Sequence, residues 1–190
     1  MTPHPPLWAQ SLAGFVTPAR HRDGILGDLR EEYHEVQQPR RGEAGADAWY
    51  VRQVLLFLWR AARWWGLGLG ALIVARDAFD VYAPTHDYYL RSAWTTYGAV
   101  ALYSACGVRA GWYYRRVLSG TVVGITSGII ASAVGLFSPL LFLHTIAGRP
   151  ELSEILDVPV PFLLLFGAIF GSLGAGIARG GGALRGVTWG

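Results

Sequence analysis

The residue types that perform catalysis or bind metal ions are scattered along this chain of 190 residues. None of its five histidines lies at i, i+4 from another, so the sequence predicts no dedicated metal site. Glu31 and Glu32 are adjacent and point to different faces of a helix, unlike catalytic carboxylates held across a cleft. The glycines at 180–182 lack the following Lys and Ser/Thr of a phosphate-binding loop. We therefore expect no enzyme activity and no cofactor.

Arg76, Asp77 and Asp80 are ionisable residues at the end of an otherwise apolar segment. Arg76 and Asp80 are four residues apart, so a helix would let them pair. Two interpretations stay open for this group: an ion or proton site inside a membrane, or a helix end whose charges reach the lipid headgroups. We favour the helix end, because charges at mid-bilayer are costly.

One stretch, Gly120–Leu143, predicts the environment in which any such site must work. It reads GTVVGITSGIIASAVGLFSPLLFL and contains no ionisable residue. At a rise of ~1.5 Å per residue, a helix of this length crosses a hydrocarbon layer of ~30 Å. Charged residues make up 15% of the whole chain, against about 25% in soluble domains. We therefore expect the chain to lie in a lipid bilayer.

Small residues recur at four-residue spacing within this stretch and place a smooth stripe on one helix face. In lipid, such a stripe lets a second helix backbone approach closely. The pattern does not say whether that second helix belongs to the same chain. The predicted packing residues are Gly120, Gly124, Gly128 and Ser132, with a second set at Gly167, Gly171 and Ala175.

Apolar periodicity predicts an all-α fold that begins with a small helical hairpin. The first helix is expected over Leu7–Val16 and the second over Ala19–Gln38, with Pro18 near the corner between them. The polar segment Pro39–Asp47 reads as a linker, with Asp47 a candidate cap for a third helix that begins near Ala46.

The remaining chain predicts a four-helix transmembrane bundle. We expect a cytoplasmic helical domain over residues 1–45, an interfacial helix over 46–63 and a four-span membrane domain over 64–190. The interfacial helix mixes Trp with Arg, as helices at headgroup depth do. Arginine supplies all the basic charge and gathers on one side of this topology, which places both termini in the cytoplasm. The predicted spans are 64–82, 92–108, 120–143 and 160–178.

Two motifs near the N-terminus resemble a bacterial family called permease prefix domain 2. The segment Ile25–Tyr33 reads ILGDLREEY, and Trp49–Val54 reads WYVRQV. The resemblance covers roughly residues 5–60, and it implies a module that precedes the membrane part of ABC-type, efflux-like permeases or stands on small membrane proteins. With no room for a large extracytoplasmic domain or an ATPase, the chain is more like a small stand-alone member. The matching residues are Gly27, Asp28, Leu29, Glu31, Glu32, Tyr33, Trp49, Tyr50, Arg52 and Gln53.

The charges of the two motifs suggest how the hairpin is held. We expect Asp28, Glu31 or Glu32 to pair with Arg52 and clamp the hairpin on the third helix. The alternative is that these are solvated helix charges, whose exposed pairs contribute only ~0–1 kcal/mol. Glycines at 24 and 27 cost helix propensity, and we expect them to allow close contact with the first helix.

Two functions fit this sequence. The first is a non-enzymatic multi-pass protein of the bacterial inner membrane whose N-terminal module docks or regulates a membrane partner such as a permease complex. The second is a small transporter or channel that self-associates through its small-residue faces. We expect no nucleic-acid partner, because the N-terminal helices hold nearly as many acids as bases.

Overall fold

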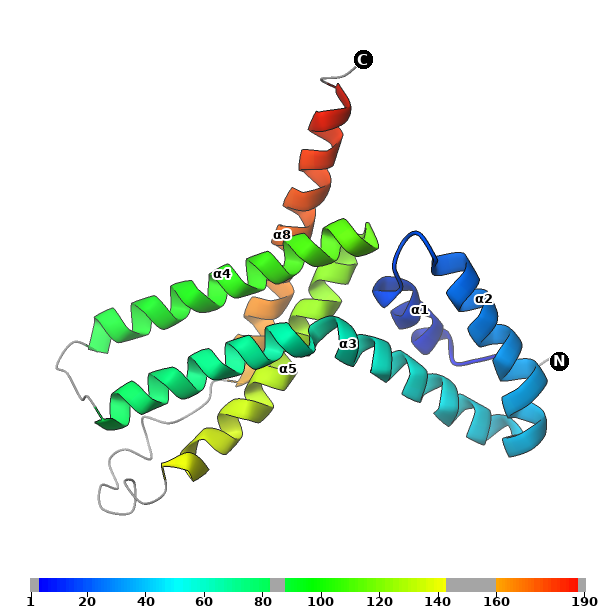
Figure 1. Ribbon diagram of the computed structural model, residues 1–190, viewed down its shortest axis with the longest axis horizontal. Helices are drawn as coiled ribbons and strands as arrows, with labels where there is room; N and C mark the ends of the chain where they lie inside the picture. Colours follow the sequence, from blue (N-terminus) through cyan, green and yellow to red (C-terminus); the bar gives the residue numbers. More distant parts are fainter. Residues whose placement is uncertain (1–3, 83–87, 143–159, 188–190) are drawn as a thin grey trace.

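A computed structural model describes residues 4–82, 88–142 and 160–187 of the chain, and this part is all-α (Figure 1). A module of short helices at the N-terminal end packs beside a bundle of long helices. The elements are α1 (Leu7–Val16), α2 (Arg22–Glu32), a π-helical turn η1 (Tyr33–Gln37), α3 (Gln38–Tyr82), α4 (Tyr88–Tyr114), α5 (Val117–Leu141) and α8 (Val160–Val187).

The first helix has the predicted bounds, while the second begins later than predicted. Helix α1 ends because Thr17 adopts an extended backbone ahead of Pro18, as residues before proline prefer. Pro18–His21 forms a turn closed by a backbone hydrogen bond of 3.1 Å from His21 to Pro18, so α2 starts at Arg22 rather than at Ala19. Helix α1 then contacts α2, α3 and α5.

The predicted linker over Pro39–Asp47 is wrong. The segment is helical except at Gly42, whose φ of 70° and ψ of 178° lie outside the helical region. Glycine adopts a positive φ without the clash that a Cβ would cause. This one residue therefore lets the chain reverse direction between η1 and the long part of α3 (Figure 1).

Beyond Gly42, α3 continues without a break to Tyr82. No interruption of the helix marks the expected boundary between residues 63 and 64. In Figure 1 the helix changes direction where it passes α5, so its first half lies under the N-terminal module and its second half lies in the bundle. One helix thus joins both parts of the described chain.

The long helices pack on one another through glycine. Helix α8 packs on both α4 and α5, and α5 also packs on α3. A Cβ added at Gly124 would collide with the Gly167 carbonyl, and one added at Gly120 or Gly107 would collide with the carbonyl of Gly171. The small residues of α5 therefore face a helix of the same chain.

Within the described residues, two helices are long and apolar enough to cross a membrane: Val117–Leu141 and Val160–Gly180. Their outward faces carry large apolar side chains that remain exposed among the described residues. Phe137 is 66% exposed on α5, and Leu173 and Ile177 are 55% and 70% exposed on α8. A helix in the core of a water-soluble protein would bury such residues, since contiguous exposed apolar surface marks contact with lipid or another protein.

Candidate functional site

The first motif forms the outer surface of the N-terminal module. Asp28, Glu31 and Glu32 are exposed on α2 and its end, while Leu29 and Tyr33 point inward and are buried. A Cβ at Gly27 or Gly24 would meet nothing within 4 Å. The expectation that these glycines allow close contact with the first helix is therefore wrong.

A tyrosine, rather than the expected carboxylates, joins the first motif to the second. The hydroxyl of Tyr33 donates a hydrogen bond of 2.7 Å to Oδ1 of Asp47, and the Tyr33 ring packs edge-to-face on Tyr50 with centroids 6.1 Å apart. Burial, followed by this hydrogen bond, raises the pKa of Tyr33 to about 12. Asp47 lies inside α3, so it accepts this bond instead of capping a helix.

The expected clamp to Arg52 is not formed. Arg52 is exposed, and in the described part of the chain no ion pair joins it to Asp28, Glu31 or Glu32. Glu32 accepts instead from the Gln37 side-chain amide at 3.1 Å, within its own turn. The motif charges thus form a solvated surface. On α3, Tyr50 is buried, and the neighbouring Trp49 and Gln53 are partly buried.

A second set of contacts holds the module against the turn between α4 and α5. Ser119 donates a hydrogen bond of 2.6 Å to the Phe15 carbonyl, and Nη2 of Arg22 donates one of 2.7 Å to the Tyr114 carbonyl. The guanidinium of Arg116 lies over the Phe15 ring, 5.7 Å from its centroid. Burial and the neighbouring Arg116 lower the pKa of Arg22. These contacts join residues about a hundred positions apart, so helix periodicity alone could not reveal them.

At the other end of the bundle, two carboxylates are buried. Asp77 is fully buried, and it pairs with Arg76 at 2.9 Å and accepts a hydrogen bond of 2.5 Å from Ser138 of α5. Asp80 is 8% exposed and lies 3.9 Å from Arg76. The expectation that these charges merely reach outward from a helix end is therefore wrong for Asp77. Ser138 was missed, although a polar residue near the end of an apolar helix is a usable signal.

Other chemistry is sparse in the described residues. No group of three or more His, Cys, Asp or Glu side chains within residues 4–82, 88–142 and 160–187 is placed to hold a metal ion. The single cysteine, Cys106, is buried, with its Sγ 3.9 Å from Oγ of Ser127. Two candidate functional sites thus remain among the described residues: the exposed surface of the N-terminal module and the buried Asp77 cluster. His86 and His144 lie outside the described residues.

Comparison with known proteins gives a distant and partial similarity to a transporter permease. The chain is 28% identical over 118 residues to the phosphate transport system permease protein PstA 2 of Mycobacterium bovis, and equally to the protein of that name from Mycobacterium tuberculosis. The match covers 60% of this chain and 37% of each relative, so the chain spans little more than a third of their length. No family model and no solved structure matches the chain.

Proposed function

We propose that the chain is a non-enzymatic, multi-pass protein of the bacterial inner membrane whose N-terminal helices dock or regulate a membrane partner such as a permease complex. One observation carries this proposal: α1, α2 and η1 are packed on α3 by buried Leu29, Tyr33 and Tyr50, while the motif charges face outward. The exposed carboxylates of Asp28, Glu31 and Glu32 form no ion pair within the described residues, which supports a role in contact with another molecule. The similarity to a phosphate transport permease supports a transport setting.

The proposed topology has four spans, with the second half of α3 and most of α4 joining α5 and α8. Exposed Leu67 on α3 and exposed Val108 and Trp94 on α4 support a lipid-facing surface on these helices too. In this topology residues 1–45 form the prefix domain, residues 46–63 lie at the interface, and both termini are cytoplasmic. The arginines that gather near the module and the α4–α5 turn support that orientation.

The proposed contact surface for the partner is the acidic face of α2. Asp28, Glu31 and Glu32 are exposed and form no ion pair within the described residues, so they remain available to cationic groups. Open space around Gly27 leaves room for a partner backbone beside them. Charged rims of this kind act mainly on partner choice and association rate.

The test is chemical cross-linking in native membranes, followed by purification of the tagged full-length chain and mass spectrometry. We expect a permease subunit to co-purify with the wild type and to be lost from the triple variant Asp28→Asn, Glu31→Gln, Glu32→Gln. Glu43→Gln is the matched control, since Glu43 is an exposed acid outside the motif. Equal recovery of a permease with the triple variant and with the control would contradict the assigned surface.

The buried Asp77 cluster favours a second candidate function, a small oligomeric transporter or channel. A fully buried carboxylate that touches Arg76 and Ser138 is the type of group that ion and proton pathways use. This function predicts ion flux in liposomes that contain the purified chain alone, and loss of that flux in Asp77→Asn. Flux that Asp77→Asn leaves unchanged would remove this candidate.

A further inference from the structure

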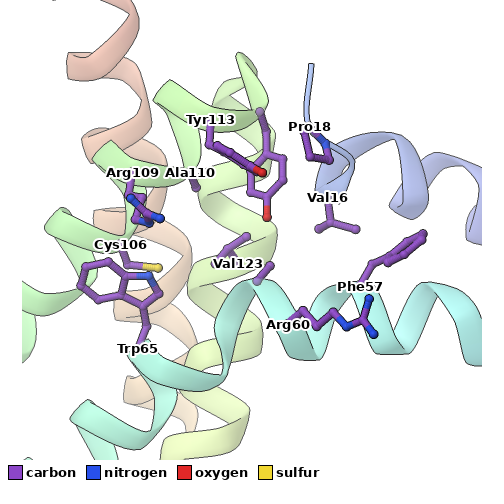
Figure 2. Close-up of a pocket in the computed structure, with 12 residues that line it drawn as sticks. Val16, Pro18, Phe57, Arg60, Trp65, Cys106, Arg109, Ala110, Tyr113 and Val123 are labelled. Carbon is purple, nitrogen blue, oxygen red and sulfur yellow. The ribbon is translucent and has the colours of Figure 1, made fainter. Parts of the chain in front are cut away.

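A cavity of about 410 Å³ lies where the N-terminal module meets the bundle. Its walls come from the end of α1, the middle of α3, the last turns of α4 and the first turns of α5 (Figure 2). Apolar and aromatic side chains form most of the lining, among them Val16, Phe57, Trp65, Tyr113 and Val123. A volume of this size suits a small organic group rather than a single water.

Two guanidinium groups give the cavity its charge. Arg60 of α3 and Arg109 of α4 line different walls (Figure 2), and none of the twelve described residues around the cavity carries a carboxylate. Both arginines are exposed, and neither forms an ion pair in the described part of the chain. The cavity therefore combines an apolar interior with two cations that lack an anion.

A second hollow beside the first extends the positive charge. It shares Pro18 and Tyr113 with the cavity, and Arg20, Arg115 and Arg179 line it. None of its described lining residues is acidic either. Five arginines thus line two neighbouring hollows, which together attract anions more strongly than an isolated arginine would.

In the proposed topology, on which this inference rests, the region lies at the depth of lipid headgroups, and exposed tryptophans support that position. Trp64 is 70% exposed and Trp112 is 77% exposed, and both lie close in sequence to cavity residues. Tryptophan gathers at the boundary between hydrocarbon and headgroups, and arginine extends from there toward phosphate. The charge-free part of α5 begins at Val117, directly after Arg115 and Arg116.

We propose that this cavity binds an anionic phospholipid, whose headgroup is attracted by Arg60 and Arg109 from two sides of the cavity and whose first acyl carbons lie against Phe57 and Trp65. The chemistry that it recognises is a phosphate group joined to an apolar chain. Basic pockets at the cytoplasmic ends of membrane helices suit such headgroups. Inorganic phosphate would also carry a negative charge, but it has no apolar part to contact the apolar wall of the cavity. A phospholipid has both, so it is the better fit.

Native mass spectrometry of the full-length protein in mild detergent tests the lipid assignment. We expect phosphatidylglycerol to bind in preference to phosphatidylcholine. Each of Arg60→Gln and Arg109→Gln should weaken phosphatidylglycerol binding about fivefold, since a cation near an anionic surface contributes ~1 kcal/mol. The affinity of the double variant for phosphatidylglycerol should be about twenty-fivefold lower than that of the wild type. Arg40→Gln is the matched control, because Arg40 is exposed on the same helix α3 but lines neither hollow.

A second variant separates shape from charge. Ala61 lines the cavity, so Ala61→Phe fills it while leaving both arginines in place. We expect this variant to lose phosphatidylglycerol while keeping the helical circular dichroism and the elution volume of the wild type. An excess of inorganic phosphate should displace little lipid from the wild type. Unchanged lipid preference in the double variant and in Ala61→Phe, or full displacement by inorganic phosphate, would overturn the proposal.

Discussion

Replacing Tyr33 and Tyr50 by phenylalanine removes the same hydroxyl from two buried rings that touch each other, yet we expect only Tyr33→Phe to lower stability. The Tyr33 hydroxyl donates to the Asp47 carboxylate at 2.7 Å. The Tyr50 hydroxyl is buried and has no hydrogen-bond partner among the described residues. Both rings belong to the core that joins the module to α3, so the two variants differ mainly in hydrogen bonding.

The expected magnitudes follow from these two environments. A hydrogen bond to a charged group contributes about 1.5–3 kcal/mol. Asp47 is partly exposed, so water replaces some of the lost bond, and Tyr33→Phe should cost about 1.5 kcal/mol. An unsatisfied buried polar group is unfavourable by about 1–3 kcal/mol. Tyr50→Phe should therefore leave the free energy of unfolding unchanged or raise it by up to about 1 kcal/mol.

The assay is denaturant unfolding of the full-length chain in mild detergent, followed by far-ultraviolet circular dichroism. A double-mutant cycle of Tyr33→Phe with Asp47→Asn should give a coupling energy of about 1 kcal/mol. Equal losses of stability in Tyr33→Phe and Tyr50→Phe would refute the reasoning, and so would strict additivity in the cycle.

The same bond predicts a pH dependence with a defined sign. Burial and Asp47 raise the pKa of Tyr33 from 10.0 to about 12, so the folded state holds this proton more tightly than the unfolded state. The contribution of Tyr33 is complete below pH 10 and is lost as the pH rises from 10 toward about 12. The stability difference between the wild type and Tyr33→Phe should therefore shrink over that interval, measured with the same unfolding assay.

Three further predictions use matched pairs of variants and the same assay. Gly124→Ala should lower the free energy of unfolding by about 1–3 kcal/mol, because its Cβ meets the Gly167 carbonyl, whereas Gly176→Ala has open space and should stabilise by up to about 1 kcal/mol. Asp77→Asn should cost about 1.5–3 kcal/mol by weakening charged hydrogen bonds to Arg76 and Ser138, with Asp80 still beside Arg76, while exposed Asp28→Asn should stay within about 0.5 kcal/mol. Ser119→Ala should cost about 1 kcal/mol through the lost bond to Phe15, and exposed Ser11→Ala should cost less.

Features that depend on local pattern could be predicted from the sequence. The apolar spacing of residues 7–16 and the following Pro18 predict α1 with its observed bounds. The absence of charge over Gly120–Leu143 predicts the long helix observed over Val117–Leu141. In both places, side-chain periodicity and composition act within a few turns of the chain, which is the range over which sequence patterns are informative.

Features that depend on distant contacts could not be predicted. The polar composition of Pro39–Asp47 indicates a linker, but helix propensity persists on either side of Gly42, whose positive φ alone provides the reversal. That reversal brings Tyr33 to Asp47. Likewise the buried carboxylate of Asp77 accepts a hydrogen bond from Ser138, 61 positions later in the chain. Charge spacing within one helix did predict the ion pair of Arg76 with Asp80, which the structure confirms at 3.9 Å, but not the closer pair of Arg76 with Asp77.

The core determines which experiments on the N-terminal module can be interpreted. One cluster of buried side chains runs from Ala9 through Tyr33 and Tyr50 to Cys106 and Val123, so it includes both the module and the bundle. Deletion of residues 1–45 would expose part of that cluster in addition to removing a docking surface. If the partner no longer bound after such a deletion, unfolding of the remaining chain would explain the result as well as loss of the docking surface would. Substitution of exposed Asp28, Glu31 and Glu32 leaves the cluster intact, and therefore tests recognition separately from stability.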